Sequence, residues 1–213
     1  MAFEVLLPIP DLALAHIQLQ HHQSLGNNIR LHSEQEGLPE LEGVRIAIVC
    51  LREKRRDPNN LSDGLSFTEV RRTFYELFPG NWHTTIADLG DIDPGASVDD
   101  TYFAIRTLNE SLFKKGIIPI YIGGSQDLVY PIYRSYDKLD QMVNIVNVDS
   151  RFDLGDASQP INNKSYVGKI IVTEPYNLFN YSNIGYQTYF NPQEEIDLMD
   201  KLYFDSYRLG NVS

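Results

Sequence analysis

The chain has 213 residues, of which 42% are hydrophobic and 22% are charged, as in an ordinary globular protein. Its 29 acidic residues outnumber its 18 basic ones and give a formal charge of -11. Such an acidic chain disfavours nucleic acid and anionic membrane surfaces as partners, because both need a basic face. No apolar run reaches the roughly 18 residues of a membrane helix, and the N-terminus lacks a secretory signal pattern. We therefore expect a cytoplasmic protein with one domain over residues 1–213.

Residues 1–43 predict an irregular N-terminal extension. Pro8 and Pro10 interrupt its opening apolar segment, and Asp11 is suited to cap a short helix. Four of the five histidines of the chain lie here, but their spacing does not indicate a metal site. We expect these histidines to be exposed or satisfied within the fold: His16, His21, His22 and His32.

Val44 to Leu51 is a nearly continuous apolar run and predicts a central parallel strand. Cys50, near its end, is the only cysteine of the chain, which excludes an internal disulfide and predicts a buried structural thiol. Residues 52–64 are rich in charged and turn-forming residues. A solvated surface loop is expected there, with anion binding by Arg55 or Arg56 as the alternative.

Helix and strand patterns then alternate along the chain. Residues 66–78 and a segment from Asp99 to near Gly116 have helical apolar spacing, with a short strand predicted at 86–89 between them. Further on, 167–173 predicts a short strand or helix end, 175–181 is irregular, and Pro192 to Tyr207 predicts an amphipathic helix. The alternation is typical of a three-layer α/β/α fold with a doubly wound, mostly parallel sheet.

Two short apolar runs, Ile117 to Ile122 and Met142 to Val148, each end where polar residues begin. We expect two parallel strands, the first buried on both faces, joined by a crossover helix over 127–140. Ligands of open α/β sheets bind outside the carboxyl ends of the strands. We therefore expect one crevice to collect the polar residues that follow the two runs: Gln126, Asp127, Asp149, Arg151 and Asp153.

These loops resemble those of the ureohydrolase superfamily, the arginase, agmatinase and formimidoylglutamase group. GGSQD at 123–127 is similar to the family's Gly-Gly-Asp-His-Ser, and DSRFD at 149–153 is similar to its Asp-Ala-His-x-Asp. NIGYQ at 183–187 resembles a signature of the formimidoylglutamase-like branch. The resemblance implies an arginase-like fold and hydrolysis of a guanidino or formimino carbon-nitrogen bond by a hydroxide that bridges two manganese ions.

The metal-binding motifs depart from the family pattern. Asp149 and Asp153 stand at positions of two carboxylate ligands, whereas Gln126 and Arg151 replace two ligand histidines. The family's later Asp-x-Asp loop has no credible counterpart before Ser213. The resemblance covers nearly the whole chain but only about the first two thirds of a family member, so the chain is expected to be truncated at its C-terminus relative to the family.

Arg151 is the replacement that departs most from a metal ligand. A guanidinium has no free lone pair and cannot ligate a metal, whereas it pairs readily with carboxylates. We expect Arg151 to occupy the metal cavity and to supply, between Asp149 and Asp153, the positive charge that two ions would bring. The alternative is that Arg151 points to solvent and that the aspartates only cap a loop.

Three functional hypotheses follow, and they leave open whether the chain is an enzyme. The first is a ureohydrolase-fold protein with a degenerate dimanganese site and no cofactor, inactive in catalysis, which acts by binding or assembly and forms a homo-oligomer. The second is a hydrolase with two manganese ions and a small guanidino or formimino ligand, completed by residues beyond Ser213 or by another subunit. The third is a different enzyme or ligand-binding module on the same fold, in which residues 123–125 present backbone amides to a phosphate or carboxylate.

Overall fold

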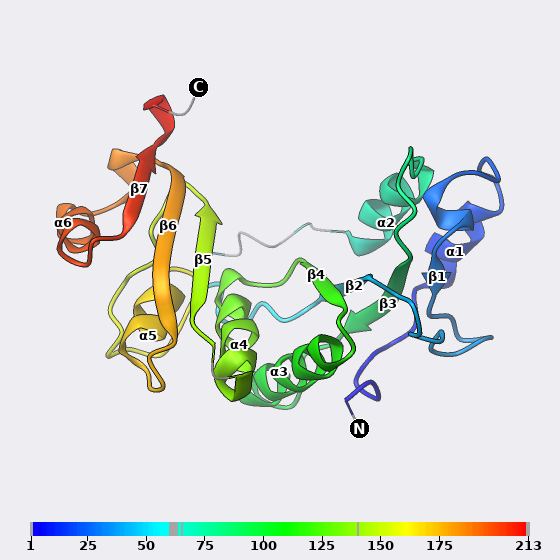
Figure 1. Ribbon diagram of the computed structural model, residues 1–213, viewed down its shortest axis with the longest axis horizontal. Helices are drawn as coiled ribbons and strands as arrows, with labels where there is room; N and C mark the ends of the chain where they lie inside the picture. Colours follow the sequence, from blue (N-terminus) through cyan, green and yellow to red (C-terminus); the bar gives the residue numbers. More distant parts are fainter. Residues whose placement is uncertain (1, 60–63, 65, 140, 212–213) are drawn as a thin grey trace. The chain divides into compact units, whose positions relative to one another are not determined.

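The computed structural model describes residues 2–59, 64, 66–139 and 141–211. They divide into two compact units, each of which is described here by itself (Figure 1). Unit 1 comprises Met1–Arg55 and Asn60–Gly124, and unit 2 comprises Arg56–Asn59 and Ser125–Ser213. The single domain over 1–213 stays a prediction.

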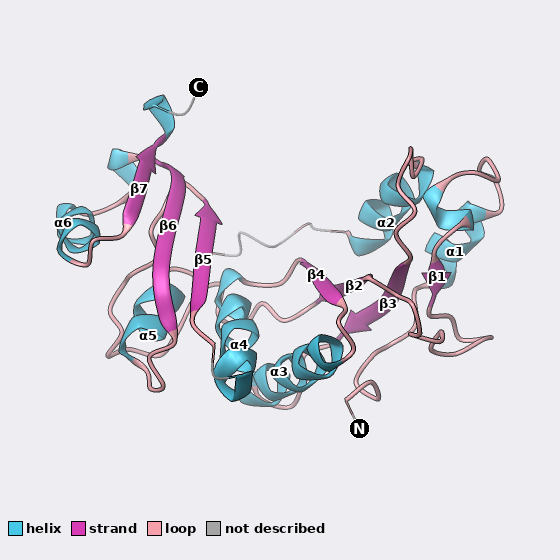
Figure 2. Ribbon diagram, viewed as in Figure 1, coloured by secondary structure: helices cyan, strands magenta, loops and turns pink. Residues whose placement is uncertain are grey.

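Unit 1 is built on a four-stranded parallel sheet with the strand order β1-β3-β2-β4 (Figure 2). Its strands are β1 (Arg30–Leu31), β2 (Ile46–Leu51), β3 (Ile86–Ile92) and β4 (Ile118–Ile122). Its helices are α1 (Asp11–Ile17), α2 (Phe67–Glu76) and α3 (Val98–Lys114), with a 3-10 turn, η1, at Leu25–Asn27. The predicted alternation of strand and helix is therefore present in this part of the chain.

The central strand β2 is buried from Ala47 to Leu51, as its apolar sequence predicts. Cys50 is fully buried, and burial raises the pKa of its thiol to about 12, which confirms a structural cysteine. The N-terminal extension contains α1 and β1, and α1 packs against α2 through Ala13, Ile17 and Tyr75. Helix α3 begins with a reciprocal cap in which Ser97 and Asp100 bond each other's backbone amides.

Unit 2 contains a separate three-stranded parallel sheet with the order β5-β6-β7. Its strands are β5 (Val143–Val148), β6 (Leu178–Tyr186) and β7 (Asp205–Arg208), and its helices are α4 (Val129–Arg134), α5 (Tyr166–Val172) and α6 (Gln193–Lys201). Short 3-10 turns lie at Gln126–Leu128 (η2), Ser135–Leu139 (η3), Thr188–Phe190 (η4) and Leu209–Asn211 (η5). The predicted crossover helix over 127–140 is thus broken into η2, α4 and η3, and Asp140 lies outside the described residues.

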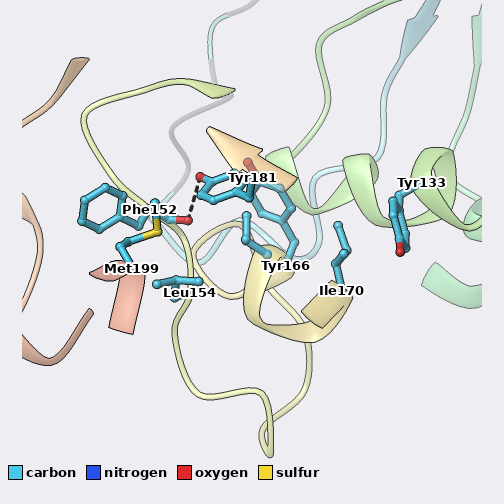
Figure 3. Close-up of a cluster of buried hydrophobic side chains, with 8 residues drawn as sticks. Tyr133, Phe152, Leu154, Tyr166, Ile170, Tyr181 and Met199 are labelled. Atoms are coloured by element: carbon cyan, nitrogen blue, oxygen red, sulfur yellow. Dashed lines mark hydrogen bonds between the residues drawn. The ribbon is translucent and has the colours of Figure 1, made fainter. Parts of the chain in front are cut away.

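An aromatic core holds unit 2 together (Figure 3). Tyr181 of β6 is fully buried, and its hydroxyl donates a 3.0 Å hydrogen bond to the carbonyl of Phe152, which also lies in the core. The bond satisfies a polar group that would otherwise be costly to bury. The remaining core side chains come from α4, α5, α6 and the loop after β5: Tyr133, Leu154, Tyr166, Val167, Ile170 and Met199.

Two sequence predictions for unit 2 are wrong. The segment 175–181 is not irregular, because β6 begins at Leu178, and 192–207 is not one helix, because α6 ends at Lys201 and β7 follows. Tyr203 has a positive φ of 56°, a conformation that no α-helix continues, and this break sends Asp205–Arg208 alongside β6. The segment 167–173, predicted as a strand or helix end, belongs to α5.

Strand β4 lies at one edge of its sheet and β5 at one edge of the other, with β1 and β7 at the opposite edges. The expected burial of β4 on both faces is wrong, because Ile118 and Ile120 are 60% and 45% exposed. On β5, Val146 and Val148 are 64% and 79% exposed, while the alternate residues face the core. Within the described ranges, no helix is long and apolar enough to cross a membrane.

Candidate functional site

The predicted site residues of unit 2 gather where β5 ends. Asp149 follows the last residue of β5, and its backbone amide donates to the carbonyl of Ile184 on β6 at 3.1 Å. The turn η2 brings Gln126 to the same place, and its side-chain amide donates to Oδ2 of Asp149 at 2.6 Å. The other oxygen, Oδ1, accepts the backbone amide of Arg151 at 3.0 Å. Both oxygens of Asp149 are therefore occupied by hydrogen bonds from the protein.

Asp153 differs sharply from Asp149 in its surroundings. It is 2% exposed, and neither of its carboxylate oxygens has a well-formed hydrogen bond within the described part of the chain, although the Tyr166 hydroxyl lies near enough to lower its pKa. Burial, together with the negative charges of Asp149 and Glu195, raises its pKa to about 7, although Arg151 opposes the shift. Its φ of 54° is unusual for a residue other than glycine. A buried carboxylate with no well-formed hydrogen bond, in a left-handed backbone conformation, is more typical of a ligand-binding site than of a packed core.

Arg151 lies close to the two carboxylates, but its guanidinium is directed to Phe190. Its Cζ atom lies 5.4 Å from the centre of the Phe190 ring, and Nη1 donates a long 3.4 Å hydrogen bond to the Phe190 carbonyl. No ion pair joins it to Asp149 or Asp153 among the described residues. The occupation of the metal cavity by Arg151 stays a prediction, to which the structure adds this cation–π contact.

Two asparagines that the sequence did not predict as site residues fix the loop. Asn191 is buried and binds three backbone groups, since it accepts from the amide of Phe152 at 2.9 Å and donates to the carbonyls of Ser150 and Gln187 at 2.9 Å each. Asn183 is fully buried and donates to the carbonyl of Arg151 at 2.7 Å. Its position inside a β-strand was the available signal, because asparagine is depleted in strands.

Asp127, the fifth predicted site residue, is fully buried and accepts a hydrogen bond from the Ser125 hydroxyl. In the parts of the chain that the structure describes, no group of three or more His, Cys, Asp or Glu side chains is placed to hold a metal ion. The histidines of the N-terminal extension fit their predicted structural roles: His32 is buried against the carbonyl of Leu89, and His16 pairs with Glu76 at 2.7 Å.

In unit 1, the charged loop after β2 is less solvated than expected, and its residues 60–63 lie outside the described ranges. Glu53 is fully buried and pairs with the guanidinium of Arg55 at 2.5 Å. The same guanidinium also donates to the carbonyls of Gly95 and Ala96 at 2.9 and 3.2 Å. The donors of Arg55 therefore serve the fold rather than an anion.

A second ion network in unit 1 surrounds Arg71 of α2, which is 1% exposed. Its guanidinium binds both oxygens of Asp88 at 2.8 and 3.1 Å, Asp91 at 2.6 Å and the carbonyl of Gly90 at 3.0 Å. Burial alone would lower the pKa of Arg71, but its bonds to Asp88 raise it above the usual value. Tyr75 and Arg52 complete the network by binding Asp88 and Asp91.

Comparison with known proteins identifies the family. The model of the arginase family matches residues 54–212. The chain belongs to the arginase family. The predicted superfamily is thereby confirmed. No curated protein matches the sequence.

Solved structures share the parallel α/β fold of this arginase-family chain. A formiminoglutamase of Trypanosoma cruzi solved with Mn2+ gives a TM-score of 0.71 at 15% identity, over 89% of this chain and 66% of that chain. The formimidoylglutamase of Bacillus subtilis gives 0.67 at 12% identity, over 79% and 56%. A quadruple mutant of an arginase-like protein of T. brucei gives 0.55 at 14% identity, over 94% and 64%. The predicted arginase-like fold is confirmed, and the chain spans 56 to 66% of the lengths of these three chains.

Proposed function

We propose that this arginase-family protein has a degenerate dimanganese site and acts by binding or assembly rather than by hydrolysis. One observation carries the proposal. Gln126 stands where the family motif has a ligand histidine, and it donates an amide N–H to Asp149 at 2.6 Å. A metal ligand must offer a lone pair, whereas this amide nitrogen offers a proton. Gln126 therefore satisfies the carboxylate by hydrogen bonding, in the way that an ion would satisfy it by coordination.

Arg151 supports the same proposal. It stands at the second histidine position and, with its permanent charge, lowers the pKa of Asp153 against the effects of burial and of Asp149. A fixed cation near two carboxylates reduces the electrostatic need for a metal ion. The remaining donor set, Asp149 and Asp153, does not fit two manganese ions, which prefer several oxygen and imidazole ligands each.

The arginase-like protein of T. brucei provides a parallel. That protein was changed at four positions, one from arginine to histidine and three from serine to aspartate. Each change installs a residue type that ligates manganese. An arginase-like chain with other residues at such positions is therefore consistent with the proposal for this protein.

The alternative function is hydrolysis of a linear amidine with the missing ligands supplied by residues after Ser213 or by another subunit. The oxygens of Asp153 favour it, because no well-formed hydrogen bond among the described residues occupies them and they could still accept a cation. With two manganese ions bound, the family's chemistry would be the activation of a water molecule. Asp149 and Asp153 would then be the residues of this chain that hold the metal.

Metal binding and turnover can be measured separately to decide between the two functions. Protein stripped with a chelator is titrated with MnCl2 while its melting temperature and its bound metal are recorded, and release of urea, formamide and ammonia is assayed. We expect no stoichiometric manganese and no turnover. Two bound ions per chain together with hydrolysis of arginine, agmatine or formimidoylglutamate would overturn the proposal in favour of the alternative.

Assembly is the second part of the proposal. Strand β5 ends its sheet with two exposed valines, Val146 and Val148, and an exposed edge of this kind readily pairs with another chain. We propose a homo-oligomer, to be tested by light scattering over a range of concentrations. A strictly monomeric protein at high concentration would contradict it.

A further inference from the structure

A cavity of about 410 Å³ lies where β6 and β7 end in unit 2, and we call it the Arg208 pocket. It is lined mainly by Tyr186, Gln187, Thr188, Tyr189, Arg208 and Leu209. Its volume falls within the roughly 300–1,000 Å³ of typical small-molecule sites. It is separate from Asp149 and Asp153, so an inference about it goes beyond the proposed function.

The position of the pocket in the sheet favours ligand binding. Strands β6 and β7 are parallel, and Tyr186 pairs with Arg208 in their register. The pocket therefore opens outside the carboxyl ends of two parallel strands, where ligands of open α/β sheets bind. Its wall is also well anchored: the Gln187 amide donates to the Ser150 carbonyl at 3.0 Å, and the Tyr186 ring packs on Phe152 with ring centres 4.8 Å apart.

The guanidinium of Arg208 has no hydrogen bond or ion pair with any residue that the structure describes, and none of the residues lining the pocket is acidic. Most of the other arginines with described contacts pair with a carboxylate: Arg52, Arg55, Arg71, Arg72, Arg106 and Arg134. A guanidinium offers five N–H donors in a planar fork that matches carboxylate and phosphate oxygens.

Neighbouring side chains add both polar and apolar binding capacity. The Gln187 amide group and the Thr188 hydroxyl make no side-chain hydrogen bond within the described residues, although both line the pocket. The Tyr189 ring is 95% exposed at the pocket, which leaves its face available for stacking. Tyrosine and arginine are the residue types that most often anchor bound partners.

We propose that the Arg208 pocket binds a small organic anion, with its carboxylate or phosphate group on Arg208 and an apolar or aromatic group against Tyr189. The Gln187 amide and the Thr188 hydroxyl bind remaining oxygens of the anion. The ligand therefore has an oxyanion attached to an apolar group. Whether that oxyanion is a carboxylate or a phosphate is decided by comparing the binding of probes of each kind.

The test uses the whole chain and four probes at constant ionic strength: benzoate, phenyl phosphate, inorganic phosphate and neutral benzamide. Binding is followed by calorimetry and by chemical-shift perturbation for the protein, for Arg208→Gln, for Arg208→Lys and for Lys201→Gln. Lys201 is an exposed cation at the end of α6 and serves as the matched control. Circular dichroism verifies that each variant is folded.

We expect benzoate or phenyl phosphate to bind and benzamide to bind much more weakly. Arg208→Gln should lower the affinity for the anion by about tenfold or more, because a charge-assisted hydrogen bond is lost. Arg208→Lys should lower it by less. Lys201→Gln should bind as the parent does. Preference for benzoate or for phenyl phosphate identifies the source as a carboxylate or a phosphate. Equal binding by Arg208→Gln, no binding of any anion, or an effect of Arg208→Gln on oligomeric state alone would overturn the proposal.

Discussion

Removal of the Arg71 guanidinium is the perturbation whose effect the structure specifies best. Arg71→Met keeps the aliphatic stem of the side chain but deletes the group that bonds Asp88, Asp91 and the Gly90 carbonyl at 2.6 to 3.1 Å. Asp88 and Asp91 are both 0% exposed, so no water replaces the lost donors. The substitution therefore leaves two buried carboxylates, with Arg52 and Tyr75 as partial compensation.

The magnitude follows from the cost of uncompensated buried charge. Breaking a buried pair by removing one partner costs about 3–5 kcal/mol in the free energy of unfolding. The neighbouring Arg72 provides a matched control, because its guanidinium is 40% exposed and pairs with Glu69 over an i,i+3 spacing at 2.9 Å. An exposed pair of this kind contributes about 0–1 kcal/mol. We therefore expect Arg71→Met to be at least about 3 kcal/mol more destabilising than Arg72→Met.

Urea unfolding followed by far-ultraviolet circular dichroism measures this difference. A double variant, Arg71→Met with Asp88→Asn, should lose less than the sum of the two single changes, because the neutral amide no longer leaves a buried charge. Equal stabilities for Arg71→Met and Arg72→Met would refute the reasoning. So would strict additivity in the double variant, since contacting residues of one network should be coupled.

Three further predictions concern the candidate site and the backbone. Burial and Asp149 raise the pKa of Asp153 from 3.8 to about 7, so the folded protein holds a proton there that the unfolded chain has released. Without metal, the free energy of unfolding should therefore fall as the pH rises from about 4 to 7, between the unfolded and folded pKa values, and Asp153→Asn should flatten that slope in urea titrations. Introducing histidine at both 126 and 151 (Q126H with R151H) should raise manganese affinity at least about tenfold, measured by metal analysis after dialysis, whereas either single change should do less. Gly90→Ala should cost about 3 kcal/mol or more in thermal unfolding, because a Cβ would lie 1.9 Å from the Leu7 carbonyl oxygen, while Gly116→Ala, with open space around it, should cost only the strain of its positive φ.

The sequence predicted the elements whose pattern is local. Cys50 lies at the end of a continuous apolar run, and the run is the buried central strand of unit 1. Asp149 follows directly after β5, and Gln126 reaches it across 23 positions of sequence, as the strand-end argument predicts. These outcomes depend only on hydrophobic patterning and on the convergence of strand ends at one edge of a sheet.

The missed features depend on contacts that no local pattern contains. Apolar spacing continues through Tyr203, but the left-handed backbone there ends the helical segment and lets β7 pair with β6. Ile118 and Ile120 have the apolar pattern of core residues, yet among the described residues their strand, β4, pairs with a neighbour on one side only. Phe190 lies 39 positions from Arg151, so the contact between its ring and the guanidinium follows from the tertiary fold alone.

The edge strands β4 and β5 differ in the backbone amides that they offer to an added strand. On β4 the amide of Ile118 donates inward to Arg45, so the residues alternating with it direct their amides outward, and one of these is Pro119, which has no N–H to give. On β5 the amides of Val143 and Asp149 point to β6, which turns those of the intervening even-numbered residues outward without any proline among them. Pairing with an added strand is therefore disfavoured at the β4 edge and allowed at the β5 edge. A proline in place of Val146 should protect the β5 edge against such pairing, as Pro119 protects the β4 edge.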